Sequence, residues 1–163
     1  MLTLPEIKEH PAQYYVAIRE ALVMPFDDKL PAIMEELFRT LESMGIQPSG
    51  PVFFKYDIVK MPELVIEFGV PVAEPVVAQG RLVTGTIPGG RYAETTYWGH
   101  YGNLMDVNAI LIGWGRQTGL RWDSSQEPDG EHFAARFEIY HNSPDEEPNP
   151  DKWETTVSIK IAE

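Results

Sequence analysis

The sequence contains no cysteine, which excludes disulfide bonds, thiol catalysis and cysteine-bound zinc. It also has few basic residues: 13 lysines and arginines stand against 25 aspartates and glutamates, so the formal net charge is −12. Affinity for a phosphate backbone comes mostly from lysine and arginine, so this balance argues against a nucleic-acid partner. The same excess of acidic residues favours solubility and attracts cations.

The chain has no run of about 18 apolar residues, the length that a membrane-spanning helix requires. Its N-terminal segment lacks the basic and apolar regions of a signal peptide. We therefore expect a cytoplasmic protein that makes no use of a membrane. With 163 residues, of which 43% are hydrophobic, the expected organisation is a single domain over residues 1–163.

Two segments carry the apolar spacing of an amphipathic helix, with side chains recurring at intervals of three and four residues. Each segment is followed closely by a glycine, Gly45 or Gly119, which can adopt the left-handed conformation that ends a helix. The first apolar stripe is Leu30, Ile33, Met34, Leu37, Phe38, Leu41 and Met44, and the second is Leu104, Val107, Ile110, Leu111 and Trp114. We interpret both stripes, Met34 and Trp114 included, as core.

Extended segments rich in branched and aromatic residues flank each helix, as strands do. They are expected at residues 14–24, 52–60, 64–70, 80–87, 92–98, 133–140 and 155–161, with acidic loops at 123–131 and 142–151. The order is strand, helix, strand, strand, and then the same order again. We predict an α+β fold of two duplicated modules, near residues 10–72 and 78–162. Pseudo-two-fold symmetry would relate them, in an antiparallel sheet with both helices on one face.

Side chains alternate between the two faces of a strand, which divides the segment 133–140 into two sets. The odd positions, such as Phe133, are apolar and are expected to face the helices. The even positions include Arg136, Glu138 and Tyr140, which would line an uncovered groove between the modules on the opposite face of the sheet.

Aromatic faces bind flat apolar molecules and attract cations. A carboxylate among such rings can act as the counter-ion of a cationic ligand, or as a proton donor or general base. The alternative interpretation is that Glu138 pairs with Arg136 on a solvated sheet surface, an ion pair worth about 0–1 kcal/mol. The residues by themselves leave both interpretations open.

Other motifs exclude more than they suggest. The four histidines, His10, His100, His132 and His141, show no spacing typical of a metal site. The glycines near residue 89 lack the Lys-Ser or Lys-Thr and the helix of a phosphate-binding loop, and no Gly-x-Ser-x-Gly motif is present. We therefore expect neither a metal nor a cofactor.

Several stretches, taken in order, resemble the GyrI-like small-molecule-binding domain, which is also the effector-binding half of AraC-type and MerR-type bacterial multidrug regulators. They are Pro48–Tyr56, Phe68–Val72, Ile87–Ala93, Trp98–Leu104, Phe137–Pro144 and Glu154–Val157. Together they extend over essentially the whole chain. The resemblance implies a duplicated strand–helix–strand–strand fold that binds varied aromatic and cationic compounds in a groove between the copies.

The same resemblance implies roles for individual residues. Glu138 would be the charged element of the groove, and its ligand-contacting neighbours would be Phe54, Tyr56, Trp98, Tyr101, Tyr140 and Trp153. Met24 and Met105 are candidates for an adaptable lining. The ligand-binding domain occupies the whole sequence, so we expect no DNA-binding half. The expected partner is a small aromatic or lipophilic molecule, cations included, bound by a monomer or a homodimer.

Three functions are compatible with these residues. The aromatic groove face and the charge of −12 favour the first, stand-alone binding of small aromatic or lipophilic compounds. The second is hydrolysis of cyclopropane-containing genotoxic natural products, an activity of some family members. There Glu138 would position or deprotonate a water while an aromatic hydroxyl, Tyr101 or Tyr56, assists. The third is protein interaction, because family members that inhibit gyrase act through protein contact.

Overall fold

The computed structural model describes residues 1–163 and shows a ten-stranded sheet with two helices. The strands are β1 (Glu6–His10), β2 (Gln13–Val23), β3 (Val52–Lys60), β4 (Glu63–Val72), β5 (Leu82–Ile87), β6 (Gly90–Trp98), β7 (Ser124–Glu127), β8 (Gly130–Phe133), β9 (Arg136–Tyr140) and β10 (Glu154–Lys160). The helices are α1 (Leu30–Met44) and α2 (Leu104–Gln117), and short 3-10 turns lie at Tyr101–Asn103 and Pro150–Lys152. No helix has both the length and the apolar character needed to cross a bilayer.

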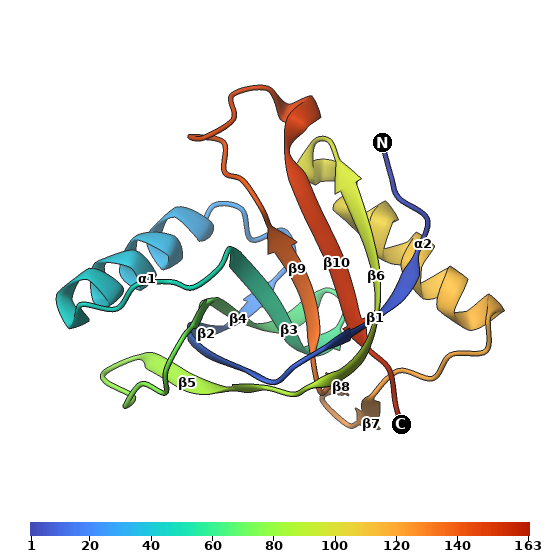
Figure 1. Ribbon diagram of the computed structural model, residues 1–163, viewed down its shortest axis with the longest axis horizontal. Coiled ribbons are helices and arrows are strands. Elements are labelled where there is room, and N and C mark those ends of the chain that lie inside the picture. Colours follow the sequence, from blue (N-terminus) through green and yellow to red (C-terminus); the bar gives the residue numbers. More distant parts are fainter.

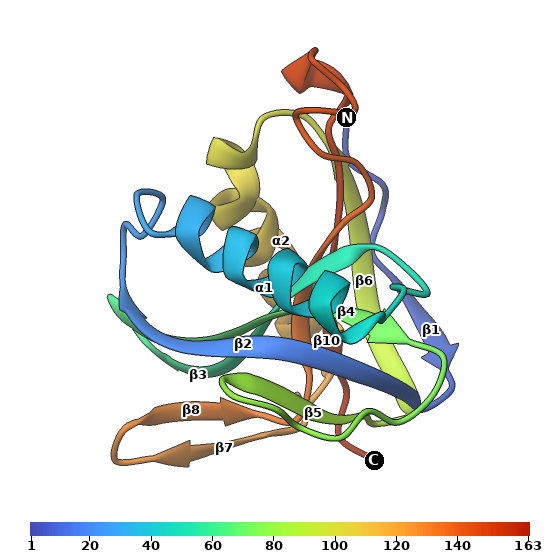
Figure 2. The ribbon, with the colours of Figure 1, turned by 90° about the vertical axis from the view of Figure 1, so that its left-hand side faces the viewer.

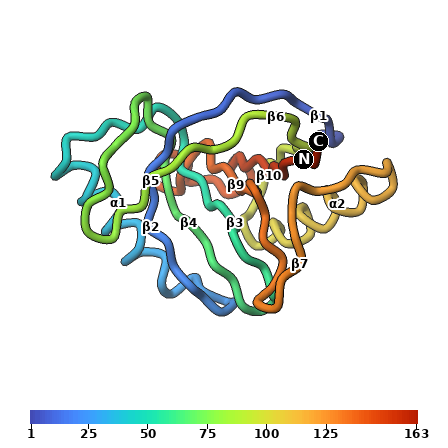
Figure 3. The backbone as a smooth tube through the Cα atoms, turned by 90° about the horizontal axis from the view of Figure 1, so that it is seen from below, coloured from blue at the N-terminus to red at the C-terminus, as the bar shows by residue number.

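The second module repeats the strand order of the first. Across the sheet the order is β5-β2-β4-β3-β9-β10-β6-β1, and each neighbouring pair is antiparallel. β3 and β9 lie side by side at the centre (Figure 3). On either side of them, β4 and β2 of the first module correspond to β10 and β6 of the second. The predicted α+β fold of two duplicated modules is confirmed.

α1 follows its sequence pattern, except that Phe38, which was predicted to be core, is 45% exposed. Pro31 lies in its first turn, where a missing backbone N–H costs nothing, and Gly45 ends it with φ +66°. Its buried residues Ile33, Leu37 and Leu41 pack on the apolar face of the first module. Figure 2 shows α1 lying over β2.

α2 packs on the second module in the same way, through Val107 and Leu111 against β6 and β10. Ile110 is an exception to the predicted stripe, because 48% of it is exposed. The two helices cover the same face of the sheet and flank β9 and β10 (Figure 1). Residues of both helices, of β3 and of β9 line a cavity over the centre of the sheet.

One predicted strand is interrupted, and the interruption changes the faces of its residues. The chain bends for two residues after Phe133, which separates β8 from β9. Phe133 packs in the α2 core, but Phe137 packs against Phe53 in a third cluster on the opposite face. Glu138 therefore points to the side of the helices. The prediction of a groove on the face away from the helices was wrong for this reason.

Three short strands, β1, β7 and most of β8, were not predicted, because their sequences are largely polar. The loop expected at 123–131 is the hairpin of β7 and β8, and β8 joins the sheet beside β3. β1 pairs with the edge of β6. β1 and β7 are largely exposed, so their sequences lack the apolar alternation that marks a half-buried strand.

The face away from the helices buries an ionic group, which we call the Glu67 cluster. Lys55 Nζ lies 2.9 Å from Glu67 Oε2 and 2.6 Å from Asp57 Oδ1. Tyr15 Oη donates a hydrogen bond of 2.9 Å to Glu67 Oε1. The cluster lies beside the ring of Phe53 and borders no large cavity.

Candidate functional site

A cavity of about 1250 Å³, the main cavity, lies between α1 and α2 over β3 and β9. More than half of its lining residues, 17 of 32, are hydrophobic, as is usual for a small-molecule site. Its charged lining residues are four acids and one arginine: Asp27, Glu138, Asp145, Glu146 and Arg136. The cavity is therefore apolar and carries an excess of negative charge.

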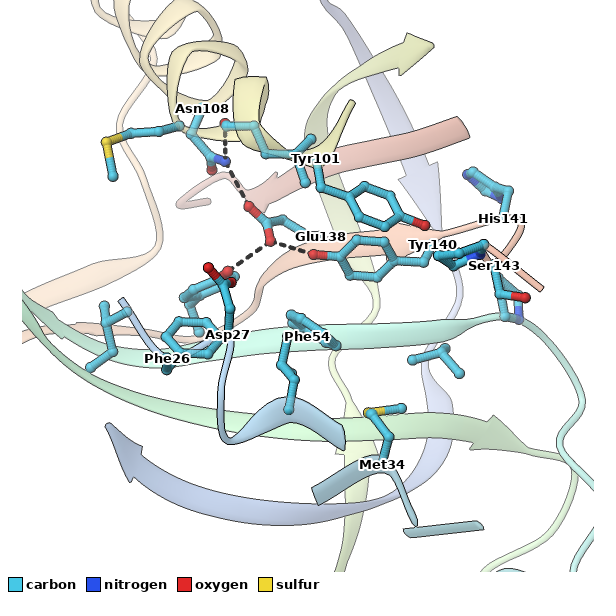
Figure 4. A pocket seen from close by; sticks show the side chains of 18 of the residues that line it. Phe26, Asp27, Met34, Phe54, Tyr101, Asn108, Glu138, Tyr140, His141 and Ser143 are labelled. Carbon is cyan, nitrogen blue, oxygen red and sulfur yellow. Dashed lines mark hydrogen bonds between the residues drawn. The ribbon is translucent and has the colours of Figure 1, made fainter. Parts of the chain in front are cut away.

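Glu138 lies on the floor of the main cavity and is 7% exposed (Figure 4). Its Oε1 accepts hydrogen bonds of 2.7 Å from the hydroxyls of Tyr56 and Tyr140. Its Oε2 accepts a bond of 3.0 Å from Asn108 Nδ2 on α2. These contacts hold the carboxylate in one orientation from both modules.

All three donors to Glu138 are uncharged. Burial, together with the charge of Glu138, raises the pKa of Tyr56 and of Tyr140 well above the ordinary value, so both hydroxyls keep their protons. Arg136 does not form the ion pair considered above, because its Nη2 donates to Asn108 Oδ1 at 3.3 Å. Glu138 is thus a buried carboxylate with no cationic side chain bonded to it.

Aromatic rings form one wall of the cavity. The rings of Phe54 and Tyr140 lie 4.6 Å apart, and Tyr101 meets Tyr140 edge to face at 5.4 Å. Trp153 stacks on Tyr101, with ring centroids 4.3 Å apart. The Tyr101 hydroxyl donates to the backbone oxygen of Asn142 at 3.3 Å, and burial raises the pKa of Tyr101.

The cavity brings together most, but not all, of the residues selected from the sequence. Its lining includes Phe54, Tyr56, Tyr101, Glu138 and Tyr140. Trp153 lies behind Tyr101 and supports it. Trp98 lies at the end of β6, where its backbone bonds to Met1, and it does not line the cavity.

Sequence reasoning missed Asn108, the third donor to Glu138. A signal for it exists: Leu104, Asn108 and Ile112 recur at intervals of four on α2 and all line the cavity. Met34, interpreted as core, packs against the α1 core and also lines the cavity. Met24 and Met105 line it as well, with Met61.

The donor set suits some chemistries and not others. No group of three or more histidine, aspartate or glutamate side chains is arranged to hold a metal ion. A fixed carboxylate beside aromatic rings can hold a cationic group by charge and by contact with ring faces. It can also accept a proton from a water molecule held beside it.

Comparison with known proteins gives a family match over nearly the whole chain. The sequence model described as the GyrI-like small molecule binding domain matches residues 4–162. No curated protein matches this chain in sequence.

Several solved structures share the fold. The C-terminal domain of EcmrR is 15% identical with a TM-score of 0.72, over 98% of each chain. EcmrR in its DNA complex is 15% identical with a TM-score of 0.77, over 98% of this chain. This chain spans 57% of the length of that one. SAV2435 bound to tetraphenylphosphonium is 8% identical with a TM-score of 0.63, over 98% of this chain and 94% of that one. A hydrolase from Listeria innocua is 14% identical with a TM-score of 0.65, over 97% and 91%.

Proposed function

Because the chain belongs to the GyrI-like small-molecule-binding family, we propose that it binds small aromatic or lipophilic cations in the main cavity, with Glu138 as their counter-ion. The observation that carries this proposal is the environment of Glu138, which is 7% exposed and hydrogen-bonded only by neutral groups. A buried charge with no counter-ion bonded to it is costly, so a ligand that brings a cation to this carboxylate gains more than it would in water.

The rest of the cavity supports a flat or bulky aromatic cation. Each contact between a cation and a ring face contributes about 0.5–2 kcal/mol to the binding of the cation. The methionines of the lining can repack around ligands of different shape. Asp27, Asp145 and Glu146 also line the cavity and add negative charge that attracts cations. The structure of SAV2435 bound to tetraphenylphosphonium supports such a ligand for this fold.

Two ions of matched shape and opposite charge test this proposal. Isothermal titration calorimetry of tetraphenylphosphonium and of tetraphenylborate compares a cation and an anion with the same four phenyl groups. We expect saturable binding of the cation and at least about tenfold weaker binding of the anion, a difference of about 1.4 kcal/mol. Equal affinities would refute charge recognition and leave only apolar contact.

Hydrolysis of cyclopropane-containing natural products is the second candidate function. The bonds between Glu138 and two tyrosine hydroxyls favour it, because Glu138 could take a proton from a water that attacks a ring carbon. A hydroxyl could then donate a proton to the group that receives the electron pair of the broken C–C bond. Tyr56 is better placed for assistance than Tyr101, whose hydroxyl bonds to Asn142. Incubation with such a compound tests this role: product formation above a buffer blank, lost on Tyr56→Phe and kept on Tyr101→Phe, supports it. A rate equal to the blank would exclude it.

A further inference from the structure

A second cavity, of about 660 Å³, adjoins the main one beyond Arg136 and has the opposite character. Arg136 and Ile112 line both cavities. Arg116 from the end of α2 and Arg121 from the following loop also line it, and we call it the arginine cavity. Three of the few basic residues of this acidic chain therefore gather around one hollow.

The acidic residues of the arginine cavity form no ion pair with its arginines, although the charge of Glu131 acts on Arg136. Asp123 Oδ2 lies 2.9 Å from Lys160 Nζ, and Glu131 Oε2 accepts a bond of 2.6 Å from Ser124 Oγ. None of the three arginines forms an ion pair within the protein. The main cavity, in contrast, carries four acids and would repel an anion.

Arg136 has donors that the protein leaves unused. A guanidinium carries five N–H groups, and that of Arg136 makes one hydrogen bond, from Nη2 to Asn108. Its Nε is buried and has no partner. Burial lowers the pKa of Arg136, yet an arginine keeps its proton at neutral pH. Nη1 also has no hydrogen-bond partner and, unlike Nε, is not buried, so the donors within reach of a ligand are on the two Nη atoms.

Aromatic rings pack against the Arg136 guanidinium but accept no hydrogen bonds from its N–H groups. Its Cζ lies 4.8 Å from the ring centre of Phe133 and 5.9 Å from that of Tyr56. Ring faces attract the charge but accept no strong hydrogen bond. A carboxylate or phosphate does both, because two of its oxygens match two parallel N–H groups of arginine.

We propose that the arginine cavity is a binding site for a small oxyanion, with an aromatic carboxylate as the favoured class. Arg136 holds the two oxygens, and Arg116 and Arg121 supply further positive charge. Phe133 and Trp122, which also line the cavity, provide apolar surface for the ring of the ligand. This site takes a ligand of the opposite charge to that of the Glu138 site, although Arg136 lines both cavities and Asn108 hydrogen-bonds to both residues.

Calorimetric titration with benzoate and with inorganic phosphate, in a buffer of weakly coordinating anions, tests the proposal. We expect benzoate to bind more tightly than phosphate. Arg136→Gln should weaken its binding by about tenfold or more, the loss of a bidentate charged contact. Arg39→Gln, which removes the same charge from an exposed pair on α1, should change nothing. A thermal unfolding curve of each variant checks that it is folded.

A second readout avoids any change in packing. In protein labelled with ¹⁵N-arginine, benzoate should shift the Nε–H signal of Arg136 and leave that of Arg39 in place. The double variant R116Q/R121Q, which alters two exposed side chains, should weaken the binding of benzoate by about threefold or more. Phosphate binding that requires Arg136 supports the oxyanion site and changes the favoured class. The proposal is overturned if neither anion gives a heat of binding or shifts the Arg136 Nε–H signal, or if Arg136→Gln binds benzoate as tightly as the wild type. These outcomes do not depend on whether tetraphenylphosphonium binds.

Discussion

Glu67 and Glu138 are two buried carboxylates on opposite faces of one sheet, and their surroundings are alike in most respects. They are 6% and 7% exposed, and each accepts hydrogen bonds from tyrosine hydroxyls. The difference is that Glu67 has Lys55 Nζ at 2.9 Å, whereas Glu138 has only neutral donors and borders a cavity.

The comparison shows what distinguishes a candidate binding carboxylate from a structural one. Burial and hydrogen bonding alone do not, since both residues have them. The Glu67 cluster is internally compensated, because burial would lower the pKa of Lys55 but Asp57 and Glu67 outweigh that effect and raise it. Glu138 has no cationic side chain bonded to it, and it borders the main cavity, where a ligand could supply the cation.

The largest expected effect follows from breaking the compensated cluster. Lys55→Met leaves the buried Glu67 without its cation and leaves Asp57 only the half-exposed Arg19, 3.4 Å away, which should lower the free energy of unfolding by about 3–5 kcal/mol. Urea denaturation measures this loss. Affinity for tetraphenylphosphonium in the folded variant should not change, because the cluster lies on the other face of the sheet.

Lys8 provides the matched control. It pairs with Glu6 at 3.2 Å, but both side chains are more than half exposed, so Lys8→Met should cost less than about 1 kcal/mol. Similar losses for the two lysine variants would mean that the Glu67 cluster is not a compensated buried group.

A smaller effect concerns the pH dependence of the same cluster. Burial, with Glu67 close by, raises the pKa of Asp57 to about 6, against about 3.9 in an unfolded chain. Between these values the folded protein keeps a proton that the unfolded chain releases. The contribution of Asp57 to stability is therefore full below about pH 4 and is lost as the pH rises through about 6.

Unfolding free energies of wild type and Asp57→Asn at pH 4 and pH 7 measure that contribution. The difference, wild type minus variant, should fall by roughly 2 kcal/mol on going from pH 4 to pH 7. A difference that stays constant, or rises, would show that Asp57 has an ordinary pKa in the folded protein.

The smallest expected effect separates the two tryptophans selected from the sequence. Trp153→Ala removes the ring stacked on Tyr101, which should weaken tetraphenylphosphonium binding by about two- to tenfold. Trp98→Ala should leave affinity unchanged, since Trp98 does not line the cavity. Calorimetry on both variants checks the order, and a larger loss for Trp98 would contradict it.

Periodicity was sufficient to predict the two helices and the repeated order of the main strands. The apolar stripe of α1 and the glycine at its end, Gly45, gave bounds that the structure reproduces. The repeated order of elements indicated two modules and a space between them. These features depend on local spacing, which a sequence displays directly.

The side of the sheet that carries the site was not predictable in this way. A bend of two residues after Phe133 reverses the alternation, and nothing in an apolar pattern marks it. Asn108 was missed, and Arg136 was considered only as a groove residue and a partner of Glu138, for a related reason. The role of Asn108 depends on its contact with Glu138 and that of Arg136 on the partners it lacks, and only the packed structure shows both.

The most direct test of the central claim is the affinity of tetraphenylphosphonium for wild type, Glu138→Gln and Glu146→Gln. Both variants remove one negative charge from the cavity lining, but only Glu138 is buried. We predict a loss of at least about tenfold for Glu138→Gln, as for a charge-assisted contact, and of no more than about fivefold for Glu146→Gln. Equal losses, or an unchanged affinity of Glu138→Gln, would contradict the account.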